Sequence, residues 1–204
     1  MSRTSRTLAL TGASAALLAP ALLTAPRPTG PGLDVEQVTS SCRASGLAGW
    51  ELVDRATRSV HDGFTHHSLW HLWESPTQAL RHGRGWSGQY NRALAQVLRS
   101  LGFQVVVVHA SRVRGLGRNP WWQTGHTWLQ VTHQGRTLDV CASRPDNRAG
   151  QVGFVPMTQV RPVHPWTREV VTAALVPVVA VEGWRMLLGG DLPRWLYRGF
   201  DEPL

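Results

Sequence analysis

A helix, a valine-rich run and a hairpin follow one another between residues 89 and 141, and this order constrains the fold more than any other feature. Gln89–Ser100 carries apolar side chains at the spacing of one helical face, and Gly102 follows as a typical C-terminal stop. Phe103–His109 contains four consecutive valines, which predicts a strand buried on both faces. The helical face consists of Tyr90, Ala93, Leu94, Val97 and Leu98.

Two short runs after this strand predict a β-hairpin. Thr127–Thr132 and Thr137–Cys141 have strand-like composition, and His133–Arg136 separates them. Within that turn, Gly135 supplies the positive φ that a tight connection needs.

Two amphipathic helices are predicted before this block, at Leu33–Arg43 and Trp50–His61. Helices followed by paired strands are the α+β pattern, so we expect helices packed on a small antiparallel sheet. The chain has 204 residues and is 42% hydrophobic, which is enough to form one domain with a core.

Composition excludes several classes of protein. Two cysteines cannot make a disulfide-rich scaffold or a four-cysteine zinc site. No charge-free apolar run reaches the roughly 20 residues of a membrane span, so a multispan membrane protein is excluded. The net charge of +8 comes entirely from arginines, since the chain has no lysine, and they are scattered singly. Without a basic run or basic helix, no nucleic-acid partner is predicted.

The two ends differ from the central domain, which we place at residues 33–165. In residues 1–32, Arg3 and Arg6 precede an Ala/Leu stretch, and a Pro/Gly-rich segment follows. A secretory signal within residues 1–25, implying a secreted or cell-envelope protein, fits this pattern. A misassigned start codon or a loosely attached helix, implying a cytoplasmic protein, fits it as well. Residues 166–204 are expected to be a C-terminal helical extension broken at Pro177 and Gly183, in which Glu182 and Arg185 argue against a membrane span.

Three polar residues could form a catalytic site. Ser87 precedes the long helix, His126 begins one hairpin strand, and Asp139 lies on the next. A hairpin can place a histidine and an aspartate on one face, and a helix packed on the sheet can present its N-terminus to both. The arrangement would be a nucleophile, a base and an orienting carboxylate. A helix cap beside an ordinary hairpin explains the same residues without catalysis.

The block from Trp50 to Val140 resembles the transglutaminase-like superfamily, which is related to papain-like proteases. The similarity rests on Gly85-Trp86-Ser87, a helix ending in Leu101-Gly102, the valine run, His126-Thr127-Trp128 and Leu138-Asp139-Val140. The resemblance implies a papain-like fold and acyl transfer or amide hydrolysis on a protein or peptide. It implies no cofactor.

The chain departs from that family at the nucleophile, where Ser87 stands in place of cysteine. A cysteine at a helix N-terminus beside a histidine can ionise near neutral pH, whereas a serine hydroxyl cannot. Three interpretations stay open: a catalytically silent relative that binds peptide or protein in its cleft, an enzyme with a Ser-His-Asp triad, and another use of the site. In an enzyme, Ser87 would attack, His126 would act as base, and Asp139 would orient it.

The remaining candidates are weaker. Cys42 and Cys141 are expected to be small buried residues, with a mutual disulfide as an alternative in an exported protein. His67 and His71 have the spacing of two zinc ligands, but no third ligand follows, and no metal site is predicted. Trp70 and Trp73 are candidate oxyanion donors by their location alone.

Overall fold

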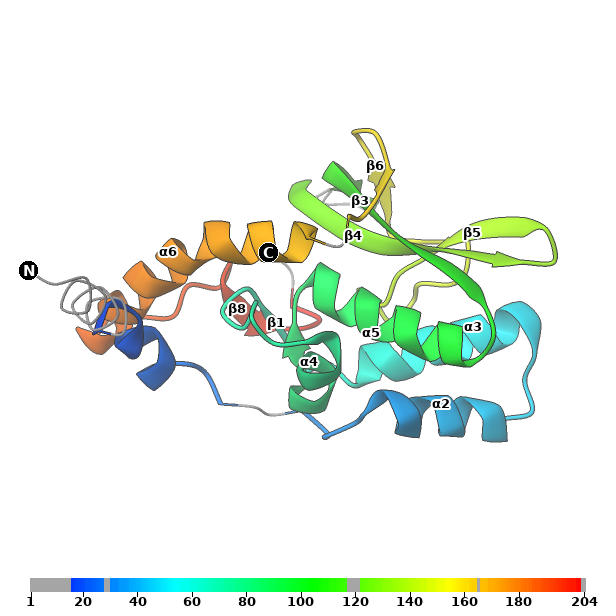
Figure 1. Cartoon of the computed structure of the whole chain (residues 1–204), viewed down its shortest axis with the longest axis horizontal. Helices are drawn as coiled ribbons and strands as arrows, with labels where there is room; N and C mark the ends of the chain where they lie inside the picture. Colours follow the sequence, from blue (N-terminus) through cyan, green and yellow to red (C-terminus); the bar gives the residue numbers. More distant parts are fainter. Residues whose placement is uncertain (1–15, 28–29, 117–121, 165, 203–204) are drawn as a thin grey trace, which may run out of the picture.

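The structure is a computed structural model that describes residues 16–27, 30–116, 122–164 and 166–202. It combines helices with antiparallel strands, which confirms the α+β class (Figure 1). Residues 16–23 are helical, and the helices that follow are α2 (Val35–Ala44), α3 (Gly49–Asp62), α4 (Pro76–His82), α5 (Ser87–Ser100) and α6 (Thr167–Leu187).

The strands form two sheets. The larger has the order β5-β4-β3-β6, with β7 also paired to β3, and all of its pairs are antiparallel. The smaller has the order β2-β1-β8 and mixes one parallel with one antiparallel pair. The strands are β1 (His66–Ser68), β2 (Arg84–Gly85), β3 (Gln104–Gly115), β4 (Trp122–His133), β5 (Arg136–Val140), β6 (Phe154–Pro156), β7 (Arg161–Pro162) and β8 (Tyr197–Gly199).

Helix α5 is the centre of the main core. Its predicted apolar face is fully buried and packs with residues of α2, α3 and the large sheet. The helix begins at Ser87, two residues earlier than the periodicity predicts, and is buried almost all round over its first half. The N-terminus of α5 therefore lies inside the protein rather than at its surface.

Strand β3 is not buried on both faces, so that prediction is wrong. Val106 is 47% exposed and Gln104 is exposed, whereas Val108 is buried. The core cluster packs against Val105 and Val107, which are only partly buried. The valine run reflects the high β-propensity of valine in a sheet that is covered on one face. Apolar composition alone does not distinguish such a strand from one that is buried on both faces.

The hairpin forms with the turn that the sequence predicts. Gln134 and Gly135 both have positive φ, at 48° and 74°, as a two-residue hairpin loop of type I′ requires. This loop pairs His133 with Arg136 and fixes the register of the remaining ladder.

The C-terminal region differs from the expected broken helix. Helix α6 runs unbroken through Pro177 and Gly183. A Cβ atom on Gly183 would lie 2.5 Å from the backbone nitrogen of Ala21, so this glycine permits a close approach of two segments instead of ending the helix. Glu169–Leu187 is long and apolar enough to cross a membrane by length and composition, with a mean hydropathy of 1.6. The extension also contributes β8, which pairs with β1.

Candidate functional site

The N-terminus of α5 meets strand β4 at Ser87. The side chain of Ser87 is fully buried, and its Oγ accepts a hydrogen bond from the backbone N–H of Thr127 at 3.3 Å. Thr127 follows His126 directly, so the structure brings the first two predicted site residues into the same region. The hydroxyl contacts the strand backbone, however, and not the imidazole.

Asn91 is the main polar link between α5 and the sheet, and the sequence interpretation missed it. Its Nδ2 donates to the carbonyl oxygen of Thr127 at 2.7 Å, and its Oδ1 accepts from the backbone N–H of Ala142 at 3.0 Å. Nδ2 also lies 3.3 Å from Sγ of Cys141. A polar residue four positions after Ser87, on a face that is otherwise buried, was the available signal.

His126 is directed toward a cysteine. Its Nε2 lies 3.5 Å from Sγ of Cys141, and its Nδ1 is buried without a hydrogen-bond partner among the described residues. The ring packs edge-on against Phe154, with centroids 4.6 Å apart. Burial, with a smaller contribution from His109, lowers the pKa of His126 to about 3. The imidazole is therefore neutral at physiological pH and weakly basic.

Asp139 is held by a tryptophan. The indole Nε1 of Trp128 donates to Oδ1 of Asp139 at 3.0 Å. In the ladder, Asp139 lies opposite Gln130. His126 is four residues before Gln130 on the same strand, so the Cα positions of His126 and Gln130 lie about 13 Å apart along β4. The register that the two-residue turn sets thus keeps Asp139 from His126.

A catalytic triad needs two hydrogen bonds, one from the nucleophile to the base and one from the base to the carboxylate. Neither bond forms among the described residues. Ser87 is not bonded to His126, and His126 is not bonded to Asp139. Cys141 supplies no alternative nucleophile, because it is completely buried and burial raises the pKa of its thiol. Cys42 is likewise buried, and both cysteines are free.

A small hollow opens beside the start of α5, between that helix, the large sheet and the first turns of α6. Its walls mix aromatic, polar and apolar side chains, and α6 covers one side of it. The lining residues are Pro76, Trp86, Gly88, Gln89, Arg92, His109, Thr127, Val163, Thr167 and Val171.

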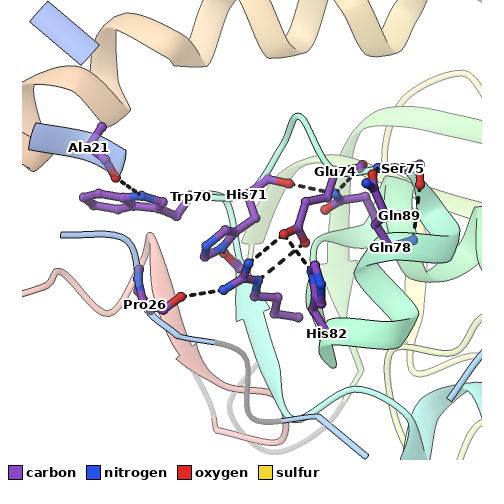
Figure 2. Close-up of polar contacts among 11 residues, drawn as sticks. Ala21, Pro26, Trp70, His71, Glu74, Ser75, Gln78, His82 and Gln89 are labelled. Atoms are coloured by element: carbon purple, nitrogen blue, oxygen red, sulfur yellow. Dashed lines mark hydrogen bonds and ion pairs between the residues drawn. The ribbon is translucent and has the colours of Figure 1, made fainter. Parts of the chain in front are cut away.

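A second polar cluster lies between β1 and α4 (Figure 2). Arg84 and Glu74 form a buried ion pair, with Nη2 and Oε1 2.6 Å apart, and Nδ1 of His82 lies 2.9 Å from the same carboxylate oxygen. Gln89 donates from Nε2 to the carbonyl oxygens of His71 and Glu74, which ties α5 to this cluster. These contacts satisfy buried charges, so the cluster is a structural element of the domain.

The weaker candidates have structural partners. The indole of Trp70 is fully buried and donates to the carbonyl oxygen of Ala21 at 3.0 Å. Its N–H group therefore already has an acceptor and is not available as an oxyanion donor. His71 bonds through Nδ1 to Ser68 Oγ at 2.8 Å. No group of three or more metal-ligating side chains occurs in the described ranges.

No protein-family model matches the chain, and a comparison with curated proteins found no match.

Proposed function

We propose that this chain is a catalytically silent relative of the transglutaminase-like, papain-like proteins, and that it binds a peptide segment of a protein partner. The observation that carries the proposal is the separate bonding of the three predicted catalytic side chains. Ser87 bonds to a backbone amide, His126 faces Cys141, and Asp139 bonds to Trp128.

The electrostatics of the site support the same interpretation. A general base works best with a pKa near the working pH, and the buried imidazole of His126 has a pKa of about 3. In a triad, a buried carboxylate bonded to Nδ1 orients the ring and stabilises its protonated form. Here Nδ1 has no such partner within the described residues. A serine hydroxyl in this setting lacks the proton acceptor that attack on an amide requires.

The hollow beside α5 is the surface on which the binding proposal rests. Trp86 and His109 provide ring surfaces there, beside the polar side chains of Gln89 and Arg92. The hollow has a volume of only about 30 Å³, so the proposed peptide lies across these rings and does not enter the hollow.

The proposal that the site is catalytically silent is tested by alkylation of a Ser87→Cys variant with iodoacetamide at neutral pH. The matched control is Ser40→Cys, which places a thiol on the exposed face of α2. We expect the thiol at position 87 to react no faster than the one at position 40, because burial hinders both its ionisation and its access. Alkylation tenfold faster than the control would show that the site activates a nucleophile and would overturn catalytic silence.

The binding interpretation is tested by selecting displayed peptides on the wild-type chain and measuring their affinity for Val171→Arg. This substitution places a charged side chain on the wall of the hollow, at a half-buried position. Peptides that lose at least tenfold in affinity would support binding there. An absence of selected peptides, or equal affinity for both chains, would overturn it.

A further inference from the structure

An apolar stripe runs along the outer face of α6. Its members recur every three or four residues, which is the spacing of one helical face. A helix on the surface of a water-soluble domain normally carries polar and charged side chains there. The exposed stripe consists of Val170, Ala173, Ala174, Pro177, Val181, Trp184, Leu187 and Leu188.

The opposite face of α6 packs on the domain and on the helical residues 16–23. Val179 is buried in a cluster with Ala21, Trp70 and Leu196. At the edge of the outer stripe, Trp184 donates from its indole to the carbonyl oxygen of Leu17 at 3.2 Å. The contacts of α6 within the protein therefore do not cover the outer stripe.

Residues 16–27 and Gly30 are tied to the domain, as Figure 2 shows in part. Ala21 accepts from Trp70, Pro26 accepts from Arg84, and the backbone of Gly30 bonds to His82 at 3.2 Å. These anchors hold residues 16–23 against the inner face of α6, so their three exposed leucines lie outside the stripe. Their exposed fractions are 59% for Leu17, 66% for Leu22 and 77% for Leu23.

Charge is distributed around this surface and is absent from its centre. Residues 170–181 contain no charged side chain. The charges of Glu182 and Arg185 neutralise one another at the C-terminal end of α6, with Nε and Oε2 2.7 Å apart. The exposed Arg27 follows residues 16–23 in sequence, and the exposed Arg194, which forms an ion pair with Glu202, follows α6.

We propose that the outer stripe of α6 forms a docking surface for a lipid bilayer with anionic headgroups. We call this surface the apolar face. Exposed tryptophans lie at both ends of α6, at Trp166 and Trp184, where aromatic side chains favour the boundary between hydrocarbon and headgroups. The net charge of +8 attracts an anionic surface, and the uncharged centre can enter the acyl layer.

The contacts of α6 with the domain indicate how the helix lies on the bilayer. Its inner face remains packed on Trp70 and Leu196, so the helix rests along the membrane plane with only its outer stripe immersed. The length of α6, about 31 Å, then provides one long contact line.

Flotation of the full chain with vesicles tests this proposal. One vesicle preparation contains phosphatidylglycerol and phosphatidylcholine, and the other contains phosphatidylcholine alone. The variants are Val170→Glu and Val181→Glu, which place a charge on the N-terminal and C-terminal halves of the apolar face. The matched control is Leu47→Glu, which changes a leucine that is 40% exposed but lies outside the face. Circular dichroism confirms that each variant is folded.

We expect the wild type and Leu47→Glu to float with the anionic vesicles, and each variant of the apolar face to lose at least tenfold in partition coefficient. Binding to the neutral vesicles should be weaker. A wild-type chain that floats with neither preparation would overturn the proposal, as would folded variants that bind like the wild type. A dimer in light scattering that Val181→Glu dissociates would identify a second copy as the occupant and would also overturn it.

Discussion

Trp128 and Asp139 are bound to one another across the β4–β5 hairpin, through an indole-to-carboxylate hydrogen bond of 3.0 Å. Trp128 is fully buried, so its N–H group needs a partner inside the protein, and Asp139 is the acceptor in reach. This pairing gives the aspartate a structural role and removes the carboxylate that would orient His126.

Loss of this acceptor should destabilise the fold. Asp139→Ala leaves the indole N–H of Trp128 unpaired, and we expect a loss of about 1–3 kcal/mol. Urea denaturation measures the change. In a double-mutant cycle with Trp128→Phe, the coupling energy should be about 1 kcal/mol, whereas independent effects of the two substitutions would contradict the assigned contact.

Asn91 should contribute strongly to stability. Asn91→Ala removes bonds to Thr127 and Ala142 and leaves two buried backbone groups without partners, which should cost about 3 kcal/mol. Gln96→Ala, at an exposed position of the same helix, is the control and should stay within about 0.5 kcal/mol. A loss in Asn91→Ala no larger than the loss in Gln96→Ala would contradict the stabilising role of the buried bonds.

The buried ion pair should respond far more than an exposed one. Glu74→Ala leaves the guanidinium of Arg84 buried and unpaired, so we expect a loss of about 3–5 kcal/mol in urea denaturation. Asp146→Ala removes an exposed partner of Arg144 and should cost less than about 1 kcal/mol. Equal small losses would mean that water reaches Arg84.

Stability should fall in mild acid because buried histidines stay neutral in the folded chain. The pKa values of His67, His71 and His126 are lowered to about 3, chiefly by burial. In the unfolded chain the pKa is near 6.5, so as the pH falls from about 6.5 toward 3 the unfolded state takes up protons that the folded state does not. Each histidine should therefore lower the unfolding free energy by about 1.4 kcal/mol per pH unit in this window.

The pH dependence can be assigned by substitution. The His126→Asn variant should bind one proton fewer than the wild type when it unfolds in acid. The number of protons follows from the change in the urea midpoint between pH 7 and pH 5. His164→Asn, at an exposed position, should keep the wild-type slope. An unchanged slope in His126→Asn would contradict the buried, neutral state of this ring.

The local elements of the main core were predictable because each has a short-range cause. The apolar face of α5 follows from its periodicity, and the hairpin turn follows from Gly135. The three-residue strands β1 and β8 were not predictable, since they pair across about 130 residues and carry no pattern of their own. Gly183 was misinterpreted as a helix breaker because a close approach to Ala21 leaves no signal near it in sequence.

Part of the site geometry was already contained in the sequence. A two-residue loop at Gln134 and Gly135 fixes every later pair of the hairpin, and counting outward puts Asp139 opposite Gln130 instead of beside His126. The contact between Cys141 and His126 could not be predicted in the same way, because it depends on side-chain directions beyond the end of β5.

The central claim is that no relay connects Ser87, His126 and Asp139, and NMR of the His126 ring tests it most directly. We expect the pKa of His126 to lie near 3, with no deshielded Nδ1 proton and with ring signals that Asp139→Asn leaves unchanged. A pKa between about 6 and 8, together with a deshielded Nδ1 proton that Asp139→Asn abolishes, would contradict the claim.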